Sequence, residues 1–251
     1  MKRILENKVV VITGASKGIG AGVAKQMAAS GAKVVVNYGS SKQEAEEVVA
    51  AIIRSGGSAV AVQGDISILA DVKRLFQETI KVYGRLDALV NNAGIYEFDL
   101  LESFTEESYR KTFDINVLGV LLASKEAAPL FDENGGSIIN ISSFAGTRPE
   151  PYSVVYAASK GAVDSITYAL SQELGPKNIR VNSIRPGGVF TEGIAKLGAS
   201  LDSDVILGTV KRSALGRMAT PDDIGNMAVF FASDESKIIT GQTVEVSGGF
   251  K

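Results

Sequence analysis

The sequence predicts an α/β fold, in which a doubly wound, seven-stranded parallel sheet carries helices on both faces. Short β-branched runs alternate with longer stretches of helical periodicity along the chain. No fixed-period repeat and no Pro/Gly/Ser-rich linker interrupts this alternation. Strand, helix and strand repeated in this way need right-handed crossovers, which place helices on both sides of a parallel sheet. We therefore expect residues 1–251 to form a single domain.

The apolar runs have the length of buried strands. We expect strands at residues 8–13, 33–37, 59–63, 86–91, 137–142, 179–184 and 243–246. Helices are expected from the turn after the first strand to about Ser30, and at residues 42–55, 72–82 and 152–174. Thr220-Pro221-Asp222-Asp223 is typical of an N-cap followed by proline in the first turn. Before it, residues 187–217 are the least regular, and we expect this excursion to form a substrate lid.

The composition narrows the possible functions. Hydrophobic residues make up 45% and charged residues 22% of the chain, which is ordinary for a globular protein. The net charge of -2 gives no field that attracts nucleic acid or a membrane, so we expect small molecules or copies of the chain as partners. The chain has no Cys and no His, so we expect no metal site, and proton chemistry falls to Tyr, Lys, Asp or Glu. With no signal peptide and no spanning apolar run, a cytoplasmic location is expected.

A glycine-rich turn directly follows the first strand and opens the next helix. Glycines in such a turn let the backbone approach a pyrophosphate, which then lies against the free N–H groups of the helix. The residues expected to contact this part of a dinucleotide are Gly14, Ser16, Lys17, Gly18 and Ile19. The turn lacks the Gly-Lys-Ser/Thr ending of a nucleoside triphosphate loop, which disfavours a phosphotransferase. A tight strand-to-helix turn without a ligand is the alternative.

The second strand ends at Asn37 and Tyr38, where a dinucleotide site faces the adenosine ribose. No carboxylate stands there to repel a 2'-phosphate, and Lys17 can pair with one. We therefore favour NADP(H) as the cofactor and leave NAD(H) open. After the third strand, Asp65 and Ile66 are expected near the adenine. Asp65 either accepts a hydrogen bond from the adenine amino group or caps the helix expected near residue 68, and the two alternatives are equally supported.

The fourth strand ends in an amide-rich turn. Asn92, Ala93 and Gly94 close this strand. Side-chain amides and a flexible glycine at this position can join neighbouring loops beside the cofactor, although the same residues also describe an ordinary turn. We count all three residues as cofactor contacts.

Tyr156 and Lys160 lie one helical turn apart, so their side chains share a helix face. An unperturbed tyrosine ionises well above neutral pH, and a neighbouring cation favours the phenolate. We expect this pair to make Tyr156 an acid in reduction and a base in oxidation. Ser143, at the end of the fifth strand, is expected to hold the substrate oxygen. A second Tyr-x-x-x-Lys, at Tyr38 and Lys42, stands near the ribose end and has no such serine before it.

Taken in order, these motifs resemble the short-chain dehydrogenase/reductase family over nearly the whole chain. The resemblance implies a Rossmann-type fold and a proton-transfer set in which Lys160 lowers the pKa of Tyr156, Ser143 orients the carbonyl and Asn116 supports a water relay. It further implies that the nicotinamide amide is lined by Pro186, Gly187, Val189 and Thr191. The usual assembly of the family is a tetramer, so a homotetramer is expected.

The function expected from these residues is an NAD(P)(H)-dependent oxidoreductase that transfers a hydride between the nicotinamide and a ketone or secondary alcohol. A 3-oxoacyl-[acyl-carrier-protein] reductase and a sugar dehydrogenase are the alternatives within this class. A non-catalytic nucleotide-sensing protein is the alternative from another class. The substrate walls are expected at residues 95–98, 144–152 and 190–206, which suits a medium-sized, partly apolar ketone.

Overall fold

A computed structural model describes residues 3–192 and 203–251. The strands are β1 (Val9–Ile12), β2 (Lys33–Tyr38), β3 (Ser58–Gln63), β4 (Ala88–Asn91), β5 (Gly136–Ile141), β6 (Ile179–Pro186) and β7 (Thr243–Val246). They form one sheet in the order β3-β2-β1-β4-β5-β6-β7, and every neighbouring pair is parallel. The predicted sheet is confirmed, and each strand lies within two residues of its expected bounds.

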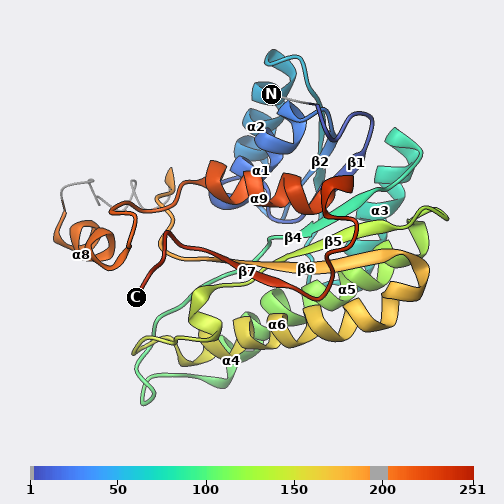
Figure 1. The fold of residues 1–251 in the computed structure, drawn as a ribbon. Helices are drawn as coiled ribbons and strands as arrows, with labels where there is room; N and C mark the ends of the chain where they lie inside the picture. The colour runs from blue at the N-terminus through green and yellow to red at the C-terminus, as the bar shows by residue number, and fades with distance from the viewer. Residues whose placement is uncertain (1–2, 193–202) are drawn as a thin grey trace.

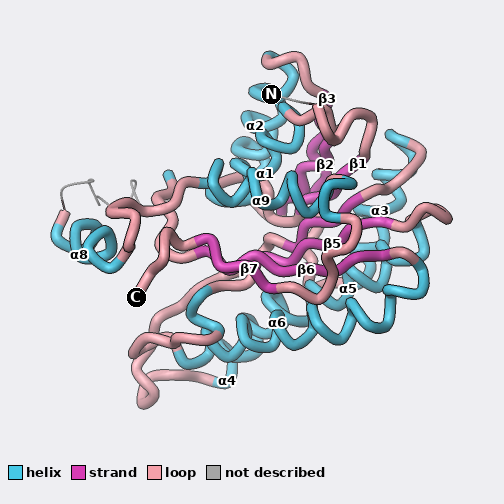
Figure 2. The backbone as a smooth tube through the Cα atoms, in the orientation of Figure 1, coloured by secondary structure: helices cyan, strands magenta, loops and turns pink. Residues whose placement is uncertain are grey.

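Helices cover both faces of the sheet (Figures 1 and 2). The principal helices are α1 (Gly18–Ala29), α2 (Lys42–Arg54), α3 (Leu69–Tyr83), α4 (Glu106–Phe113), α5 (Gly119–Ala127), α6 (Val154–Leu174), α8 (Asp204–Arg212) and α9 (Pro221–Ala232). Helices α1, α2 and α9 pack on one face, and α3, α5 and α6 pack on the other, so that the core has two apolar clusters separated by the sheet. Between β1 and β4 the chain changes direction across the sheet, and this crossover point is where parallel α/β sheets bind ligands.

Helix α9 begins where the sequence predicts. Thr220 caps it by accepting a hydrogen bond from the Asp223 backbone N–H, and Pro221 occupies the first turn. Arg217 contacts Asp223 at 2.7 Å, and this hydrogen bond holds the pKa of the Asp223 carboxyl well below its usual range. The helix packs so closely on α1 that a Cβ on Gly22 would lie 2.3 Å from the Cβ of Pro221. Glycine is therefore required at this crossing.

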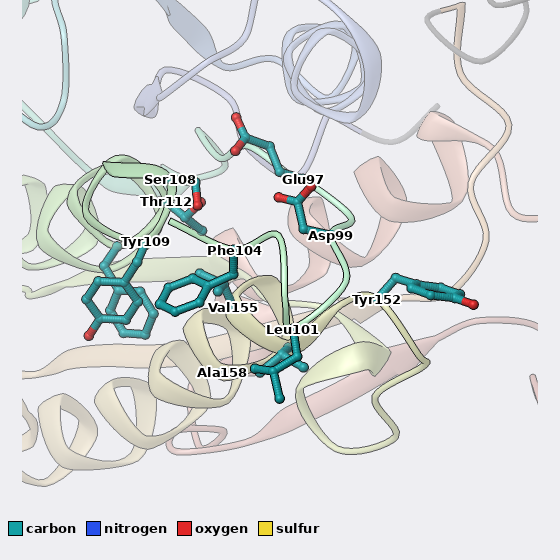
Figure 3. Close-up of a pocket in the computed structure, with 12 residues that line it drawn as sticks. Glu97, Asp99, Leu101, Phe104, Ser108, Tyr109, Thr112, Tyr152, Val155 and Ala158 are labelled. Carbon is teal, nitrogen blue, oxygen red and sulfur yellow. The ribbon is translucent and has the colours of Figure 1, made fainter. Parts of the chain in front are cut away.

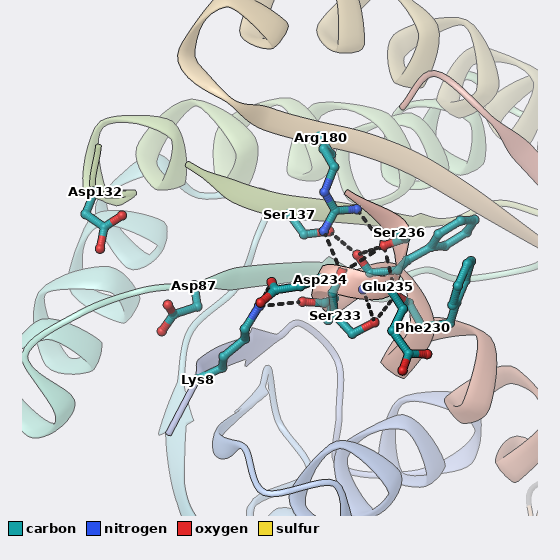
Figure 4. Close-up of polar contacts among 12 residues, drawn as sticks. Lys8, Asp87, Asp132, Ser137, Arg180, Phe230, Ser233, Asp234, Glu235 and Ser236 are labelled. Carbon is teal, nitrogen blue, oxygen red and sulfur yellow. Dashed lines mark hydrogen bonds and ion pairs between the residues drawn. The ribbon is translucent and has the colours of Figure 1, made fainter. Parts of the chain in front are cut away.

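Two cationic side chains cap the carboxyl end of α9, which lies at the amino end of the sheet (Figure 4). The Nζ of Lys8 donates to the Ala232 carbonyl at 3.3 Å and contacts Asp234 at 2.6 Å. Arg180 donates to Ser236 Oγ at 2.8 Å and to the Ser233 carbonyl at 3.3 Å. Positive side chains stabilise a helix carboxyl terminus, whose carbonyls are otherwise without partners. This polar cluster is structural, because the ligand edge of the sheet is at the other end of the strands.

Two expectations about helices need correction. Helix α6 begins at Val154 rather than residue 152, because Tyr152 has a φ of 69°, which is incompatible with a right-handed helix. The irregular excursion over residues 187–217 contains α8, and residues 193–202 of it lie outside the described residues. Over the described ranges, no helix has both the length and the apolar character needed to cross a membrane.

Candidate active site

A cleft of about 760 Å³ opens at the carboxyl ends of the strands. Most residues predicted for the cofactor and the chemistry line it. They are Gly14, Ser16, Lys17, Gly18, Ile19, Asn37, Asp65, Ile66, Asn92, Ala93, Gly94, Ser143, Tyr156, Lys160, Pro186, Gly187, Val189 and Thr191. The lining also includes residues that the sequence reasoning did not assign, among them Gly20, Gly39, Ser40, Ser41, Gln63 and Gly64. Ser40 and Ser41 could have been predicted to line the cleft, since they are polar residues just beyond a buried strand.

The β1–α1 turn has the backbone of an anion cradle. Gly14 and Gly18 have φ values of 60° and 58°, which favour glycine. A Cβ on Gly20 would lie 2.4 Å from Nδ2 of Asn92 and 2.6 Å from the carbonyl oxygen of Gly14. Helix α1 starts without a side-chain cap and without an acidic residue in its first turn, so its N–H groups remain available to an anion. These residues fit a pyrophosphate.

Asn92 and Thr13 hold this cradle against β4. The side-chain amide of Asn92 donates to the carbonyls of Thr13 and Gly14 at 2.9 and 3.0 Å. The hydroxyl of Thr13 accepts hydrogen bonds from the backbone N–H groups of Asn92 and Ala93, both at 3.0 Å. The link between neighbouring loops that was expected from the amide-rich turn is therefore present. It joins the β1–α1 turn to the turn after β4 at the centre of the cleft.

The ribose end of the cleft differs from the expectation at Tyr38. Its side chain is 9% exposed and belongs to the apolar core beneath α1 and α2, and Tyr38 does not line the cleft. Strand β2 extends through Tyr38, so the first exposed positions are those of Gly39 and Ser40. Asn37 lines the cleft, but its amide is used internally, since Nδ2 donates to the Gly64 carbonyl at 3.0 Å and Oδ1 accepts from Gly14 N–H at 3.2 Å. No carboxylate occupies this strand end, and Lys17 is exposed beside it.

Asp65 does not cap α3. Its Oδ1 accepts hydrogen bonds from the backbone N–H and the hydroxyl of Ser67, at 2.9 and 2.6 Å. The N-cap position belongs to Ile68, whose side chain cannot accept a hydrogen bond. The capping alternative is therefore wrong, and Asp65 remains at the cleft surface as a candidate acceptor.

Tyr156 and Lys160 project from the first turns of α6 toward the end of β5. The Nζ of Lys160 lies 5.9 Å from the centre of the Tyr156 ring and donates to the Ile141 carbonyl at 2.8 Å. Ser143, two residues beyond Ile141, accepts a hydrogen bond from Ala145 N–H at 3.2 Å, and its hydroxyl lowers the pKa of the Tyr156 phenol. The phenol, the hydroxyl and the ammonium thus meet at one point of the cleft.

Burial dominates the electrostatics of this group. Burial raises the pKa of the Tyr156 phenol, and the hydrogen bond with Ser143 opposes this rise only in part. Lys160 was expected to lower that pKa; its ammonium lies 5.9 Å from the ring and donates to the Ile141 carbonyl, and the effect of burial is the larger one. Burial also lowers the pKa of Lys160 to about 8, with Asp164 acting in the opposite direction. The residues of this chain therefore keep the phenol protonated near neutral pH, as a proton donor requires.

Asn116 lies behind the cleft rather than on its surface. It sits in a short π-helical segment, Asp114–Leu118, between α4 and α5. Its Oδ1 accepts from Ile95 N–H at 2.8 Å, and its Nδ2 donates to the Ile95 carbonyl at 2.9 Å and to Ser159 Oγ at 3.0 Å. Both amide hydrogens are thus engaged within the protein. Asn116 fixes the loop after β4 next to α6. The water-relay role implied by the resemblance stays a prediction.

Comparison with known proteins gives consistent matches over almost the whole chain. A family model described as "Enoyl-(Acyl carrier protein) reductase" matches residues 14–251. An uncharacterized oxidoreductase of Methylorubrum extorquens is 49% identical over 98% of this chain and 99% of its own. A hydroxynaphthalene reductase-like protein of Metarhizium robertsii is 38% identical, covering 98% of this chain and 96% of its own.

Solved structures agree in fold and length. A short-chain dehydrogenase/reductase from Serratia marcescens superposes with a TM-score of 0.92 at 32% identity, covering 98% of this chain and 99% of its own. A short-chain dehydrogenase from Burkholderia cenocepacia, solved in complex with NADP, has a TM-score of 0.90 at 34% identity and covers 98% of both chains. The chain therefore belongs to the short-chain dehydrogenase/reductase family of NAD(P)-dependent oxidoreductases.

Proposed function

We propose that this enzyme reduces a ketone to a secondary alcohol, and catalyses the reverse reaction, with Tyr156 as the group that exchanges the proton. The observation that carries the proposal is the convergence of Tyr156, Ser143 and Lys160 at one end of a cleft whose other end is a glycine cradle fit for a pyrophosphate. The cofactor, when bound, supplies or accepts the hydride at its nicotinamide ring. Four residues lie on the cleft wall, where they would contact that ring: Pro186, Gly187, Val189 and Thr191.

Each side chain has a distinct part in the proton transfer. Tyr156 holds its proton near neutral pH and donates it to the carbonyl oxygen. The Oγ of Ser143 accepts from Ala145 N–H, so its own hydrogen is left to orient the same oxygen. The ammonium of Lys160 compensates the negative charge that the phenolate carries after donation. Asn116 holds Ile95 and thereby the loop that faces the phenol.

We propose NADP(H) as the preferred cofactor. Support comes from the carboxylate-free end of β2 and from the exposed ammonium of Lys17. Replacing Lys17 by Glu is expected to weaken NADPH binding by about tenfold or more and to change NADH binding much less, because a charged hydrogen bond to the 2'-phosphate is worth about 1.5–3 kcal/mol. Lys25→Glu, an exposed position on the same helix, is the matched control. Tighter binding of NADH than NADPH by the unmodified enzyme would contradict the preference.

The substrate class is tested with a panel. Oxidation of NADPH and NADH is followed against simple ketones, a 3-oxoacyl thioester, an enoyl thioester and, in the reverse direction, sugars. The proposal expects the ketones to be reduced, and Ser143→Ala to lose activity by about a hundredfold with NADPH binding retained. Preferred turnover of the 3-oxoacyl thioester or of sugars would favour the corresponding alternative. Tight NADPH binding without turnover of any compound would favour a nucleotide-sensing protein.

We also propose that the single domain assembles as a homotetramer. Leu118, Leu121 and Tyr168 on the α5 and α6 side are 40%, 41% and 63% exposed. Strand β7 forms an edge of the sheet, and an edge strand needs covering in solution. Light scattering should therefore give about four times the 26.3 kDa chain mass. A monomeric mass at micromolar concentration would refute this assembly.

A further inference from the structure

Two large aromatic side chains are exposed to solvent beside the phenol of Tyr156. Tyr96 and Phe98, on the loop after β4, are 60% and 59% exposed. Each contacts the ring of Tyr156, with ring centres 6.4 and 6.2 Å apart, and the two contact each other at 6.0 Å. The three rings therefore form one aromatic cluster, and Tyr96 also lines the cleft. Exposed rings grouped at a binding cleft are the surfaces that flat apolar ligands contact.

The charged residues of the same loop lie on its other side. Glu97 and Asp99 line a separate outer cavity of about 190 Å³ between this loop, α4 and the start of α6 (Figure 3). Glu97 pairs there with Lys111 at 2.8 Å. The side chains of residues 96–99 thus alternate, with aromatic rings toward Tyr156 and carboxylates toward the outer cavity. The face of the loop that meets the substrate is uncharged.

The cleft offers little to an anionic substrate. Among its described lining residues, the cations are Lys17, at the glycine turn, and Lys160, which is 5% exposed and directed at the Ile141 carbonyl. A carboxylate or phosphate attached next to the reacting carbonyl would therefore find no free cation in the described wall around Tyr156. The wall instead presents ring faces and edges.

The loop is held at both ends, which keeps the rings in place. At one end, Ile95 exchanges two backbone hydrogen bonds with the side-chain amide of Asn116, at 2.8 and 2.9 Å. At the other end, Asp99 N–H donates to the carbonyl of Tyr152 at 2.8 Å. Tyr152 holds the left-handed φ of 69° that was noted above, a strained conformation that persists only where its surroundings require it. A wall fixed in this way loses less freedom on binding a ligand.

We propose that Tyr96 and Phe98 determine specificity, and that they select uncharged ketones whose carbonyl carbon is attached to a planar aromatic ring. The inference rests on the proposed function and adds a substrate class to it. The substrate ring packs against this pair while the carbonyl oxygen reaches Tyr156 and Ser143. Aromatic pairs contribute enough beyond simple area burial to change selectivity by about two- to tenfold for each protein ring.

The test compares acetophenone with cyclohexyl methyl ketone, which has the same carbon skeleton without a planar ring. The two ketones differ in intrinsic reactivity, so the readout is the change on mutation in the ratio of their kcat/KM values. Tyr96→Leu and Phe98→Leu should each lower the ratio, aromatic over cyclohexyl, by about two- to tenfold. Tyr96→Phe, which retains the ring, should leave it within about twofold of the unmodified enzyme.

Phe104→Leu is the matched control, since Phe104 is an aromatic residue of the same loop whose ring lines the outer cavity instead. The ratio of kcat/KM values for the two ketones should be the same in this variant as in the unmodified enzyme. The inference is overturned if the leucine variants lower kcat/KM for both ketones equally, or leave the ratio unaltered while unfolding and NADPH binding stay normal. If the unmodified enzyme reduces other simple ketones of the panel but not acetophenone, this inference fails and the proposed function stands. If it binds NADPH and reduces no ketone of the panel, the proposed function fails as well.

Discussion

Replacement of Gly20 by alanine should damage both the stability and the cofactor site. The added Cβ would lie 2.4 Å from Nδ2 of Asn92 and 2.6 Å from the Gly14 carbonyl oxygen, and real Cβ atoms do not approach other atoms so closely. Asn92 must then move and lose its hydrogen bonds to the carbonyls of Thr13 and Gly14. Two hydrogen bonds at about 0.5–1.5 kcal/mol each, plus about 1–3 kcal/mol for overpacking, give a loss of roughly 2–6 kcal/mol.

Urea unfolding followed by circular dichroism measures that loss, and NADPH titration measures the effect on the cradle. For a chain of this size the same loss corresponds to a fall in Tm of about 4–24 °C in a thermal scan, and we expect a weaker affinity for NADPH. Gly175→Ala is the control, because a Cβ there would meet no atom within 4 Å and its φ is helical. Wild-type stability and NADPH affinity of Gly20→Ala would refute the claim that this close approach shapes the site.

Two further substitutions test the electrostatics and the substrate excursion. Burial lowers the pKa of Lys160 to about 8, so between that pH and about 10.4 the unfolded chain binds a proton that the folded chain does not, and stability from this group rises with pH. Lys160→Met should thus remove a penalty of up to about 3 kcal/mol in the free energy of unfolding below pH 8. The variant should show a higher urea midpoint that converges with that of wild type at high pH, while its turnover is lost. A stability difference that does not depend on pH would contradict this. Arg212 joins α8 to Glu150 and to the ring of Phe250, 4.2 Å away. Arg212→Ala should raise the substrate KM by about threefold to thirtyfold with NADPH affinity unchanged, because exposed contacts of these two kinds are together worth about 0.7–2 kcal/mol. An unchanged KM would show that α8 does not shape the substrate site.

The sheet could be predicted from the sequence because its signal is local. Each buried parallel strand needs a short run of β-branched residues, such as Val9–Ile12, whatever the rest of the fold does. The glycine turn was equally readable, since positive φ at Gly14 and Gly18 restricts those positions almost to glycine. Strand ends have a weaker local pattern, and an extension of β2 by one residue buries Tyr38, which was expected at the cofactor.

The remaining features depend on contacts between distant segments. The π-helical segment that turns Asn116 inward has no pattern of its own, and its partners Ile95 and Ser159 are far away in the sequence. The sequence also suggested that Lys160 lowers the pKa of Tyr156. Residue spacing shows which side chains share a helix face, but it does not show how deeply the phenol is buried or where the ammonium points. The wall at residues 95–98 was expected, whereas its division into aromatic and acidic sides was not.

Single-turnover kinetics of Tyr156→Phe test the central claim most directly. Enzyme saturated with NADPH is mixed with a ketone, and the loss of NADPH absorbance is followed in a stopped-flow instrument. If the phenol supplies the proton, hydride transfer should slow by a factor of about 10²–10⁴, while the dissociation constant for NADPH stays within about twofold of wild type. A hydride-transfer rate within a few fold of wild type would show that another group delivers the proton.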